Sequence, residues 1–337
     1  MAMNRGHGWF GFGEQSARDT LAAAPTVAVY ASDSSDGISS KLNWDDVKLT
    51  MGGRSNLAEH SVSGVDAEFK LTTLAFADLV GIVLAAALGS DDVDGEESPY
   101  THTVTAGEDL PYLTVRQQVG SATAALQELR NAKVDKVKLT AEGTRPLVVE
   151  VEAKGTKASW LSATSWSGAD PADASDGWYT SSGCTVLLSL NDGTPAAISS
   201  DIVLEKLEVE VENDVESKSS LGKAEPGEVK EGTCKVSYTL TGSCTSTDVY
   251  RTCVTGSASG TAVATSVVAG SIQATFPHTV ETGWALSILS PTVPWDCEVP
   301  SVDPEGGPFD LTLKCEGTVD AGSGLVTVTL LNGLAAY

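Results

Sequence analysis

The chain contains few residue patterns that could support catalysis, and each lacks a part that the chemistry needs. Residues 6–11 (GHGWFG) have the glycine spacing of a dinucleotide-binding loop. That loop works only between a strand and the start of a helix, whose amides receive the pyrophosphate. Nothing strand-like precedes the run, so it is interpreted as a flexible or aromatic-anchored segment. Residues 256–260 (GSASG) are similar to a nucleophile turn, but Ala258 stands where the serine is required, which indicates a simple turn.

An acidic run at residues 91–97 (DDVDGEE) could bind a cation. Its carboxylates cluster around a turn glycine, as in a calcium-binding loop that would begin at Ser90. Such a loop needs a glutamate at its twelfth position, which here is Thr101. The pattern therefore favours a solvated acidic loop, with weak cation binding as the alternative. The acids of this loop are Asp91, Asp92, Asp94, Glu96 and Glu97.

Histidine and cysteine form no recognisable centre in the sequence. His60, His102 and His278 could act as bases, but none accompanies a nucleophile and an orienting acid in a known motif. His102 lies between threonines in a strand-like run, which indicates a packed or hydrogen-bonded side chain. The six cysteines all lie at position 184 or later, without Cys-x-x-Cys spacing. We therefore expect free, mostly buried thiols, no metal, no cofactor and no catalytic residue.

The charge balance argues against a conventional sequence-specific DNA- or RNA-binding protein. The 337 residues include 45 Asp and Glu against 21 Lys and Arg, a net charge of −24, so phosphate is repelled over most of the surface. The start of the chain lacks the charged region and apolar run of a secretory signal peptide, which gives no support for export. The most apolar stretch, residues 74–88, contains Asp78 and Gly81 and is shorter than the ~20 residues that cross a bilayer, so no membrane span is expected.

Alternating apolar and polar residues predict a mainly β protein. The pattern of half-buried antiparallel strands recurs at residues 134–139, 147–151, 204–211, 236–240, 311–315 and 326–330. Residues 75–88 break it, because they are rich in Ala and Leu and end before Gly89, which suits a left-handed helix cap. We expect a helix there, packed on a sheet. Its packing face has helical spacing and consists of Leu79, Val80, Val83, Leu84 and Ala87.

Weak internal similarity predicts a tandem duplication. The matching segments keep their order: 64–72 with 232–241, 104–107 with 267–270, 146–155 with 308–317 and 190–191 with 331–332. An ordered series of this kind favours two copies of one sheet-plus-helix domain. The predicted organisation is an N-terminal arm at residues 1–30, a first domain at 31–197 with an extra loop, and a second domain at 198–337. Turn-rich residues 191–197 would connect the two domains.

Several segments, in their order along the chain, resemble the tail tube proteins of long-tailed bacteriophages. The segments that carry the likeness are residues 11–17 (GFGEQSA), 62–69 (VSGVDAEF), 76–89, 100–104 (YTHTV), 109–115 (DLPYLTV) and 136–140 (KVKLT). They look like the family's N-terminal segment, the strand before its helix, the helix itself and the runs that follow. The second half of the chain resembles the family less, and none of the segments is a catalytic motif.

The resemblance implies a structural virion protein rather than an enzyme. Members of the family form rings that stack into the duct between head and tail tip. The implied fold is tandem antiparallel β-sandwich or barrel tail-tube domains, each with a packed α-helix. Such proteins commonly form hexameric rings, so two tube domains in one chain imply trimeric, pseudo-hexameric rings, with a hexamer of chains as the alternative. The other implied partners are tape-measure, tail-terminator and distal tail proteins.

A tail tube also fits the charge of the chain. Genome DNA must pass through the lumen without sequence-specific binding, and a negative wall would not hold it. The implied location is the virion tail, after synthesis in the host cytoplasm. Under this hypothesis the loop at residues 90–99, with its acids from Asp91 to Glu97, and the N-terminal arm bridge successive rings.

Two other classes of protein remain open. An acidic β-sandwich from a cell surface or S-layer, ordered by calcium at residues 91–97, fits the composition. The missing signal-peptide pattern counts against it. A carbohydrate-active β enzyme could use Trp160, Trp166 and Trp178 as sugar platforms beside paired carboxylates. Tryptophans in loops are more often packing or interface anchors, and the sequence nominates no acid pair.

Overall fold

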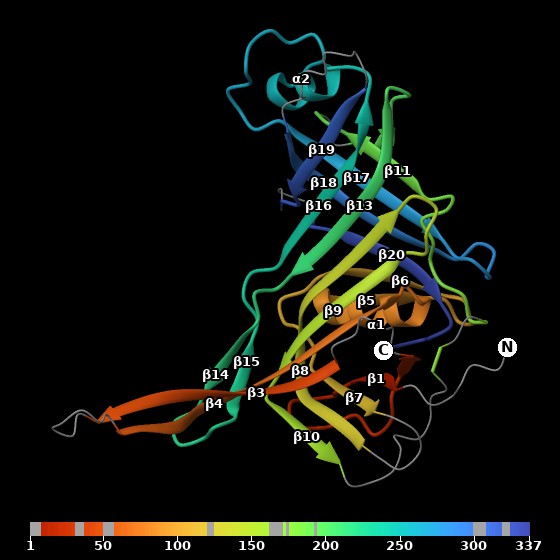
Figure 1. The fold of residues 1–337 in the computed structure, drawn as a ribbon. Coiled ribbons are helices and arrows are strands. Elements are labelled where there is room, and N and C mark those ends of the chain that lie inside the picture. Colours follow the sequence, from red (N-terminus) through yellow and green to blue (C-terminus); the bar gives the residue numbers. More distant parts are fainter. Residues whose placement is uncertain are drawn as a thin grey trace.

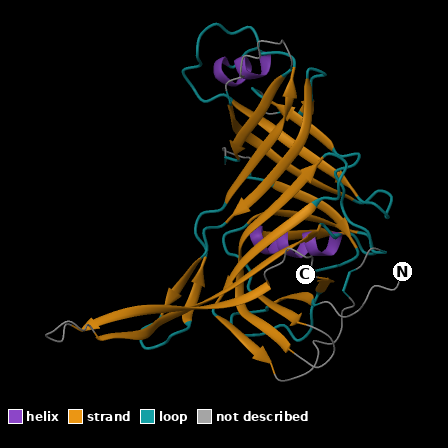
Figure 2. Cartoon of the chain, in the orientation of Figure 1, coloured by secondary structure: helices purple, strands orange, loops and turns teal. Residues whose placement is uncertain are grey.

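The protein is mainly β, with antiparallel sheets around one buried helix and a second helix at one end (Figure 1, Figure 2). This confirms the predicted fold class. The computed structural model describes residues 8–30, 37–49, 57–119, 125–161, 171–172, 175–191, 194–298, 308–318 and 324–337.

The elements fall into two groups along the chain. The first group comprises β1 (Trp9–Glu14), β2 (Val27–Tyr30), β3 (Gly37–Leu49), β4 (Leu57–Leu74), α1 (Ala77–Leu88), β5 (Gly89–Asp94), β6 (Tyr100–Ala106), β7 (Leu113–Val119), β8 (Ala125–Glu142), β9 (Val148–Gly155) and β10 (Lys157–Leu161). The second comprises β11 (Thr185–Ser189), β12 (Ala196–Ala197), β13 (Ile202–Glu212), β14 (Glu216–Ser219), β15 (Pro226–Lys230), β16 (Lys235–Cys244), α2 (Asp248–Thr255), β17 (Ala269–Pro277), β18 (Ala285–Cys297), β19 (Phe309–Glu316) and β20 (Thr327–Asn332).

The two groups share one pattern of antiparallel strand pairing, apart from the pairs β5–β6 and β14–β15, which have no counterpart among the described strands of the other group. In the first group the pairs are β1–β2, β1–β7, β7–β8, β8–β9, β8–β10, β9–β4 and β4–β3. In the second they are β11–β12, β11–β17, β17–β18, β18–β19, β18–β20, β19–β16 and β16–β13. A helix follows β4 in one group and β16 in the other. We call the groups repeat 1 (β1 to β10) and repeat 2 (β11 to β20); a tandem duplication would leave this arrangement.

The repeats begin at other residues than the predicted domains. β1 lies in the segment predicted as an N-terminal arm, yet it pairs on both edges, with β2 and β7, and buries Phe10 and Phe12. Gly11 therefore lies in a strand and not in a phosphate-binding loop, while residues 6 and 7 of that glycine run lie outside the described residues. β11 and β12 precede residue 198 but pair within repeat 2. Strands this short carry too little periodicity to be recognised in the sequence.

Strand β9 illustrates how the sequence forms these sheets. Val149, Val151 and Ala153 are buried, and the residues that alternate with them are partly exposed. Lys70 of β4 bonds Glu152 on the outer face at 2.7 Å. Such partly exposed ion pairs add modest stability, so burial of the alternate apolar side chains contributes most.

Helix α1 is enclosed by strands instead of lying on one sheet (Figure 2). Eleven of its twelve residues are buried, among them the five predicted to pack. It contacts strands of both repeats, including β8 of repeat 1 and β20 of repeat 2. The structure differs here from the single packing face that was expected. A Cβ on Gly81 would lie only 1.7 Å from the Tyr337 hydroxyl oxygen, so small residues let the C-terminal tail approach the helix.

One apolar core runs through both repeats. Side chains of repeat 1, such as Phe69 and Leu84, belong to the same buried cluster as Tyr238, Ile288 and Leu330 of repeat 2. The predicted boundary between two domains therefore does not separate two cores.

A buried carboxylate in β8 provides a test of this packing. The Glu128 side chain is almost fully buried and accepts hydrogen bonds from Arg116 Nε at 2.6 Å and from Arg130 Nε at 2.7 Å. Glu128→Ala removes the buried acceptor that two partly exposed arginines share, so we expect the free energy of unfolding in urea to fall by roughly 1–3 kcal/mol. Glu142→Ala, which removes an exposed partner of Arg145, should cost less than about 1 kcal/mol. Equal losses in the two variants would contradict this.

Candidate assembly surface

The two repeats are joined edge to edge through β8 and β13. Seven residue pairs run along the two antiparallel strands. On one face Lys136 bonds Glu210 at 2.7 Å, and Lys138 bonds Glu208 at 2.8 Å. The junction thus places lysines on β8 opposite glutamates on β13. On the other face the buried side chains are Val137, Leu139, Val209 and Val211.

Just beyond β13, Asn213 reaches the C-terminal end of α1. Its side-chain amide donates to the Ala87 carbonyl at 2.8 Å and to the Val134 carbonyl at 3.0 Å, and the residue is 1% exposed. Ala87 lies in the last turn of the helix, where carbonyls have no partner within the helix. Repeat 2 therefore satisfies a backbone group of the repeat 1 helix.

A second connection joins β6 of repeat 1 to β20 of repeat 2, and it contains His102. The His102 side chain is fully buried. Its Nδ1 lies 2.9 Å from an Asp91 carboxylate oxygen, and its Nε2 lies 2.9 Å from the Leu334 carbonyl oxygen. The prediction of a hydrogen-bonded histidine is confirmed. This histidine ties β6 both to its neighbour β5 and to the C-terminal segment.

The acidic run lies mostly in a strand, which corrects the predicted loop. Asp91, Asp92 and Asp94 are part of β5, which pairs with β6, and only Glu96 and Glu97 lie in the turn that follows. The sequence concealed the strand because aspartate is depleted in strands; here the ladder to β6 and the Asp91–His102 contact outweigh that preference. Among the described residues no group of His, Cys, Asp or Glu is arranged to hold a metal ion.

Shared pairing registers match the repeats residue by residue. The sequence match of β9 with β19 gives the first pair of counterparts, Ala153 and Cys315, and each cross-strand neighbour gives the next. On the next strands, Phe69 of β4 corresponds to Tyr238 of β16. One strand further, Ile38 of β3 corresponds to Val209 of β13. β3 is therefore the counterpart of β13.

Bulges extend the match to β8 and β18. The ladder shifts register between Leu113 and Val115 in β7, and between Gly270 and Ile272 in β17. If these two bulges are equivalent, β18 is the counterpart of β8. β20 pairs with β18 as β10 pairs with β8, so β20 is the counterpart of β10. Trp160, opposite Gln127 of β8, then occupies the place of Val328, opposite Ile288 of β18.

Positions that the junction buries in repeat 2 are exposed in repeat 1. Asn213 is 1% exposed, whereas its counterpart Leu42 is 47% exposed. Val328 is 1% exposed, whereas its counterpart Trp160 is 62% exposed. At these positions β3 and β10 expose side chains where β13 and β20 bury theirs.

β3 has one edge to which no described strand is paired. Its partner on the other edge is β4. The N–H of Ile38 points away from β4 and donates to Gln117 Oε1 at 2.7 Å. Alternate N–H groups of a strand point the same way, so the Ser40 N–H also faces this edge. Ser40 is exposed, whereas its counterpart Val211 is buried.

The end of β18 offers a second such edge. One side of this end pairs with β19, while on the other side the ladder to β17 stops at Pro294. Beyond it Asp296 and Glu298 are exposed, and they are the counterparts of Lys136 and Lys138. The charges are therefore reversed relative to the β8–β13 junction. The acids lie on β18, the counterpart of β8, and Lys41 lies on β3 at the position that corresponds to Glu212 of β13.

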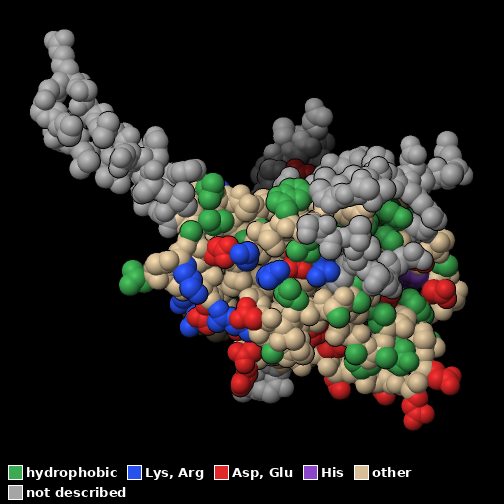
Figure 3. Space-filling model, turned by 90° about the horizontal axis from the view of Figure 1, so that it is seen from below, with side chains coloured by type: hydrophobic (Ala, Val, Ile, Leu, Met, Phe, Trp, Pro, Cys, Tyr) green, Lys and Arg blue, Asp and Glu red, His purple; other side chains and the backbone are tan. Residues whose placement is uncertain are grey.

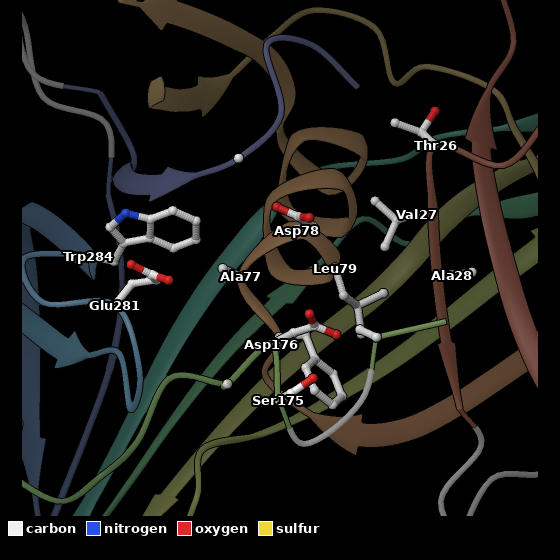
Figure 4. Close-up of a pocket in the computed structure, with 14 residues that line it drawn as sticks. Thr26, Val27, Ala28, Ala77, Asp78, Leu79, Ser175, Asp176, Glu281 and Trp284 are labelled. Atoms are coloured by element: carbon white, nitrogen blue, oxygen red, sulfur yellow. The ribbon is translucent and has the colours of Figure 1, made fainter. Parts of the chain in front are cut away.

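A separate pocket of about 340 Å³ lies at the N-terminal end of α1 (Figure 4). The carboxylates of Asp78, Asp176 and Glu281 and the indole of Trp284 surround it, together with residues of β2. The pocket joins elements of both repeats and carries negative charge. Burial raises the pKa of Asp78 above that of an ordinary aspartate, and the nearby Asp176 charge raises it further.

The tryptophans proposed as sugar platforms do not gather at this pocket. Trp178 packs edge-on against Phe76 with ring centroids 6.4 Å apart, and Trp160 is on β10. Trp166 lies outside the described residues. The six cysteines are free thiols, and four of them are buried.

The residues of the β8–β13 junction were not predicted, although the sequence contains a signal for them. Residues 136–142 (KVKLTAE) and 206–212 (KLEVEVE) are alternating runs with lysines in one and glutamates in the other. Such complementary charges are typical of neighbouring strands. Asn213 and the open edge of β3 gave no comparable signal, because their roles depend on contacts distant in the chain.

No protein-family model matches the chain, and no curated protein matches it. None of the helices in the described ranges is long and apolar enough to cross a membrane.

The raised pKa of Asp78 predicts how stability depends on pH. The folded protein holds the Asp78 proton more tightly than the unfolded chain does, so this group lowers stability as pH rises from the unfolded pKa through the folded one. We expect Asp78→Asn to be at least as stable as the wild type at pH 7, with the advantage disappearing at acidic pH. Thermal melts of both proteins across this range test it. A variant that is less stable at pH 7 would refute the assignment.

Proposed function

We propose that this chain is a structural protein that self-assembles head to tail into closed rings, which stack into the hollow tail tube of a long-tailed bacteriophage. The observation that carries the proposal is the junction between the repeats. Repeat 1 contributes β8 to it and repeat 2 contributes β13. Their counterparts, the end of β18 and β3, each have an edge to which no strand in the described part of the chain is paired. Repeat 2 of one chain can therefore join repeat 1 of the next by the same contact.

Side chains along the proposed contact are complementary. Transferring the β8–β13 register places Lys41 of β3 opposite Asp296 of β18 in the neighbouring chain, and Ser40 opposite Cys297. Opposite charges facing each other across an antiparallel pair stabilise it. The interaction would repeat at every junction between two chains of a ring.

The second helix supports the same arrangement. Helix α2 follows β16 as α1 follows β4, but only Val249, Thr252 and Cys253 of its eight residues are buried. Within repeat 1 the enclosure of α1 is completed by strands of repeat 2. The next chain would cover α2 in the corresponding way.

A contact that is not self-complementary either closes into a ring or continues as an open filament. We infer a ring of six repeats, which needs three chains; a ring of six chains is the alternative. DNA would pass through the lumen without sequence-specific binding, because a chain of net charge −24 repels phosphate. Tape-measure, tail-terminator and distal tail proteins are the further partners, and the virion tail is the location after synthesis in the host cytoplasm.

Contacts between stacked rings need projecting elements. The β3–β4 hairpin extends away from the body of the protein (Figure 1), and the turn that carries Glu96 and Glu97 follows β5. Acidic side chains stand along the rim of the face seen from below (Figure 3). We propose the turn as one inter-ring contact, and as a second the exposed residues 16–20 of the predicted N-terminal arm, which lie between β1 and β2.

A proline on the open edge of β3 tests the ring contact. Ser40→Pro removes the outward N–H and leaves the ladder to β4, because a proline is tolerated on an edge strand. We expect rings or tubes in negative-stain electron micrographs of the concentrated wild-type protein, with threefold modulation in end-view averages, and monomers for Ser40→Pro. Ser40→Ala retains the N–H and should assemble. Wild-type protein that stays monomeric at every concentration would refute the proposal.

Charge exchange tests the register. Lys41→Glu and Asp296→Lys each place like charges opposite one another, so each variant should assemble only at higher protein concentration than the wild type. Combining the two substitutions restores an opposite-charge pair and should recover assembly, measured by sedimentation. If the double variant assembles no better than the single ones, the two residues do not face each other.

A further inference from the structure

We propose that residues 261–268 of one chain form an added strand along β10 of the next chain in the ring. The inference rests on the head-to-tail assembly proposed above. This added strand would form a second line of contact, or seam, between neighbouring chains, separate from the contact between β18 and β3. The segment that fills it belongs to a second copy of the chain.

The segment has the composition of a strand but forms none in the single chain. Its sequence, TAVATSVV, contains no charge, no proline and several β-branched residues. The structure assigns it no helix or strand. Val263 is 72% and Val267 77% exposed, and the Ala264 N–H donates to the Val254 carbonyl at 3.0 Å. A stretch of this kind readily adds to an open sheet edge.

Its place in the repeat indicates which edge. The segment follows α2, and in repeat 1 the chain that follows α1 forms β5 and β6. β6 pairs with β20 of repeat 2 over six residue pairs. The counterpart of β20 is β10, so the segment after α2 would pair with β10 of the following chain.

β10 has the features of an acceptor. Among the described strands it pairs with β8 alone, whereas β20 pairs with both β18 and β6. Lys157 at its start is held by Glu225 at 2.8 Å. Trp160, three residues further, is 62% exposed. The strand is thus anchored at its start, while no described strand pairs with its second edge and its largest side chain is exposed.

Trp160 would also meet α2 of the neighbouring chain. Its counterpart Val328 lines the same small apolar cavity as Leu84 of α1. Both contacts join repeat 2 of one chain to repeat 1 of the next chain. In each of them, repeat 2 takes the place that repeat 1 has in the junction within a chain. One association event would therefore bury the β3 edge, Trp160 and the two exposed valines together.

Hydrogen exchange measured by mass spectrometry separates the two seams. The comparison uses wild-type protein assembled at high concentration and the Ser40→Pro variant as the unassembled reference. We expect amides of residues 261–268 and of β10 to exchange at least ~10-fold more slowly in the assembly, because they enter a strand ladder. Protection of the exposed part of β3 without protection of residues 261–268 would overturn this seam and leave the ring proposal standing. A chain that never assembles overturns both.

Substitutions in the segment give a second readout. Thr265→Pro interrupts any ladder through residues 261–268, and Thr265→Ala preserves the backbone donor. Thr265 is exposed in the single chain, so neither change should alter the melting temperature of the monomer. We expect Thr265→Pro to raise the concentration needed for assembly about tenfold, and Thr265→Ala to leave it nearly unchanged. Equal assembly by the two variants would overturn the seam.

Discussion

The need to pair backbone groups at sheet edges governs this structure. Burying a backbone N–H or carbonyl away from water without a hydrogen-bond partner costs free energy. A strand edge must therefore be paired, covered or exposed to water. The two repeats meet this need for each other along β8 and β13 and along β6 and β20. The apolar core, the enclosed helix and the Asn213 hydrogen bonds all depend on those two ladders, because they set how closely the repeats approach.

Helices α1 and α2 occupy equivalent places in the two repeats but have different surroundings, and their compositions differ accordingly. Apart from Asp78 in its first turn, helix α1 (ADLVGIVLAAAL) is apolar around its whole circumference, as suits a helix surrounded by strands of both repeats. Helix α2 (DVYRTCVT) buries one side only and exposes Asp248 and Arg251. The same division separates β13 from β3, since Val211 and Asn213 are buried where Ser40 and Leu42 are exposed. At these positions the residues of repeat 1 and repeat 2 differ in the way that their surroundings differ.

Local patterns allowed much of the fold to be predicted. Strands such as β9 and β13 alternate clearly, and the apolar run before Gly89 indicated α1, because burial on one or all faces leaves a period in the sequence. The paired segments around β4 and β16 also gave the repeats. β1 and β5 could not be recognised, since short or acidic strands have weak periods. The acids Asp91, Asp92 and Asp94 were assigned to a loop for that reason. The β8–β13 junction was not predicted although its two strands carry complementary charges, because the paired runs lie about seventy residues apart in the chain.

The covalent link between the repeats has a kinetic consequence. Because β8 and β13 belong to one chain, their junction forms at an effective concentration set by the connecting segment, commonly in the millimolar range, and does not depend on how dilute the protein is. Two separate single-repeat chains would meet by diffusion and part again. In any closed assembly of these repeats every second junction is therefore already made when the chain has folded, and mass action controls only the junctions between chains.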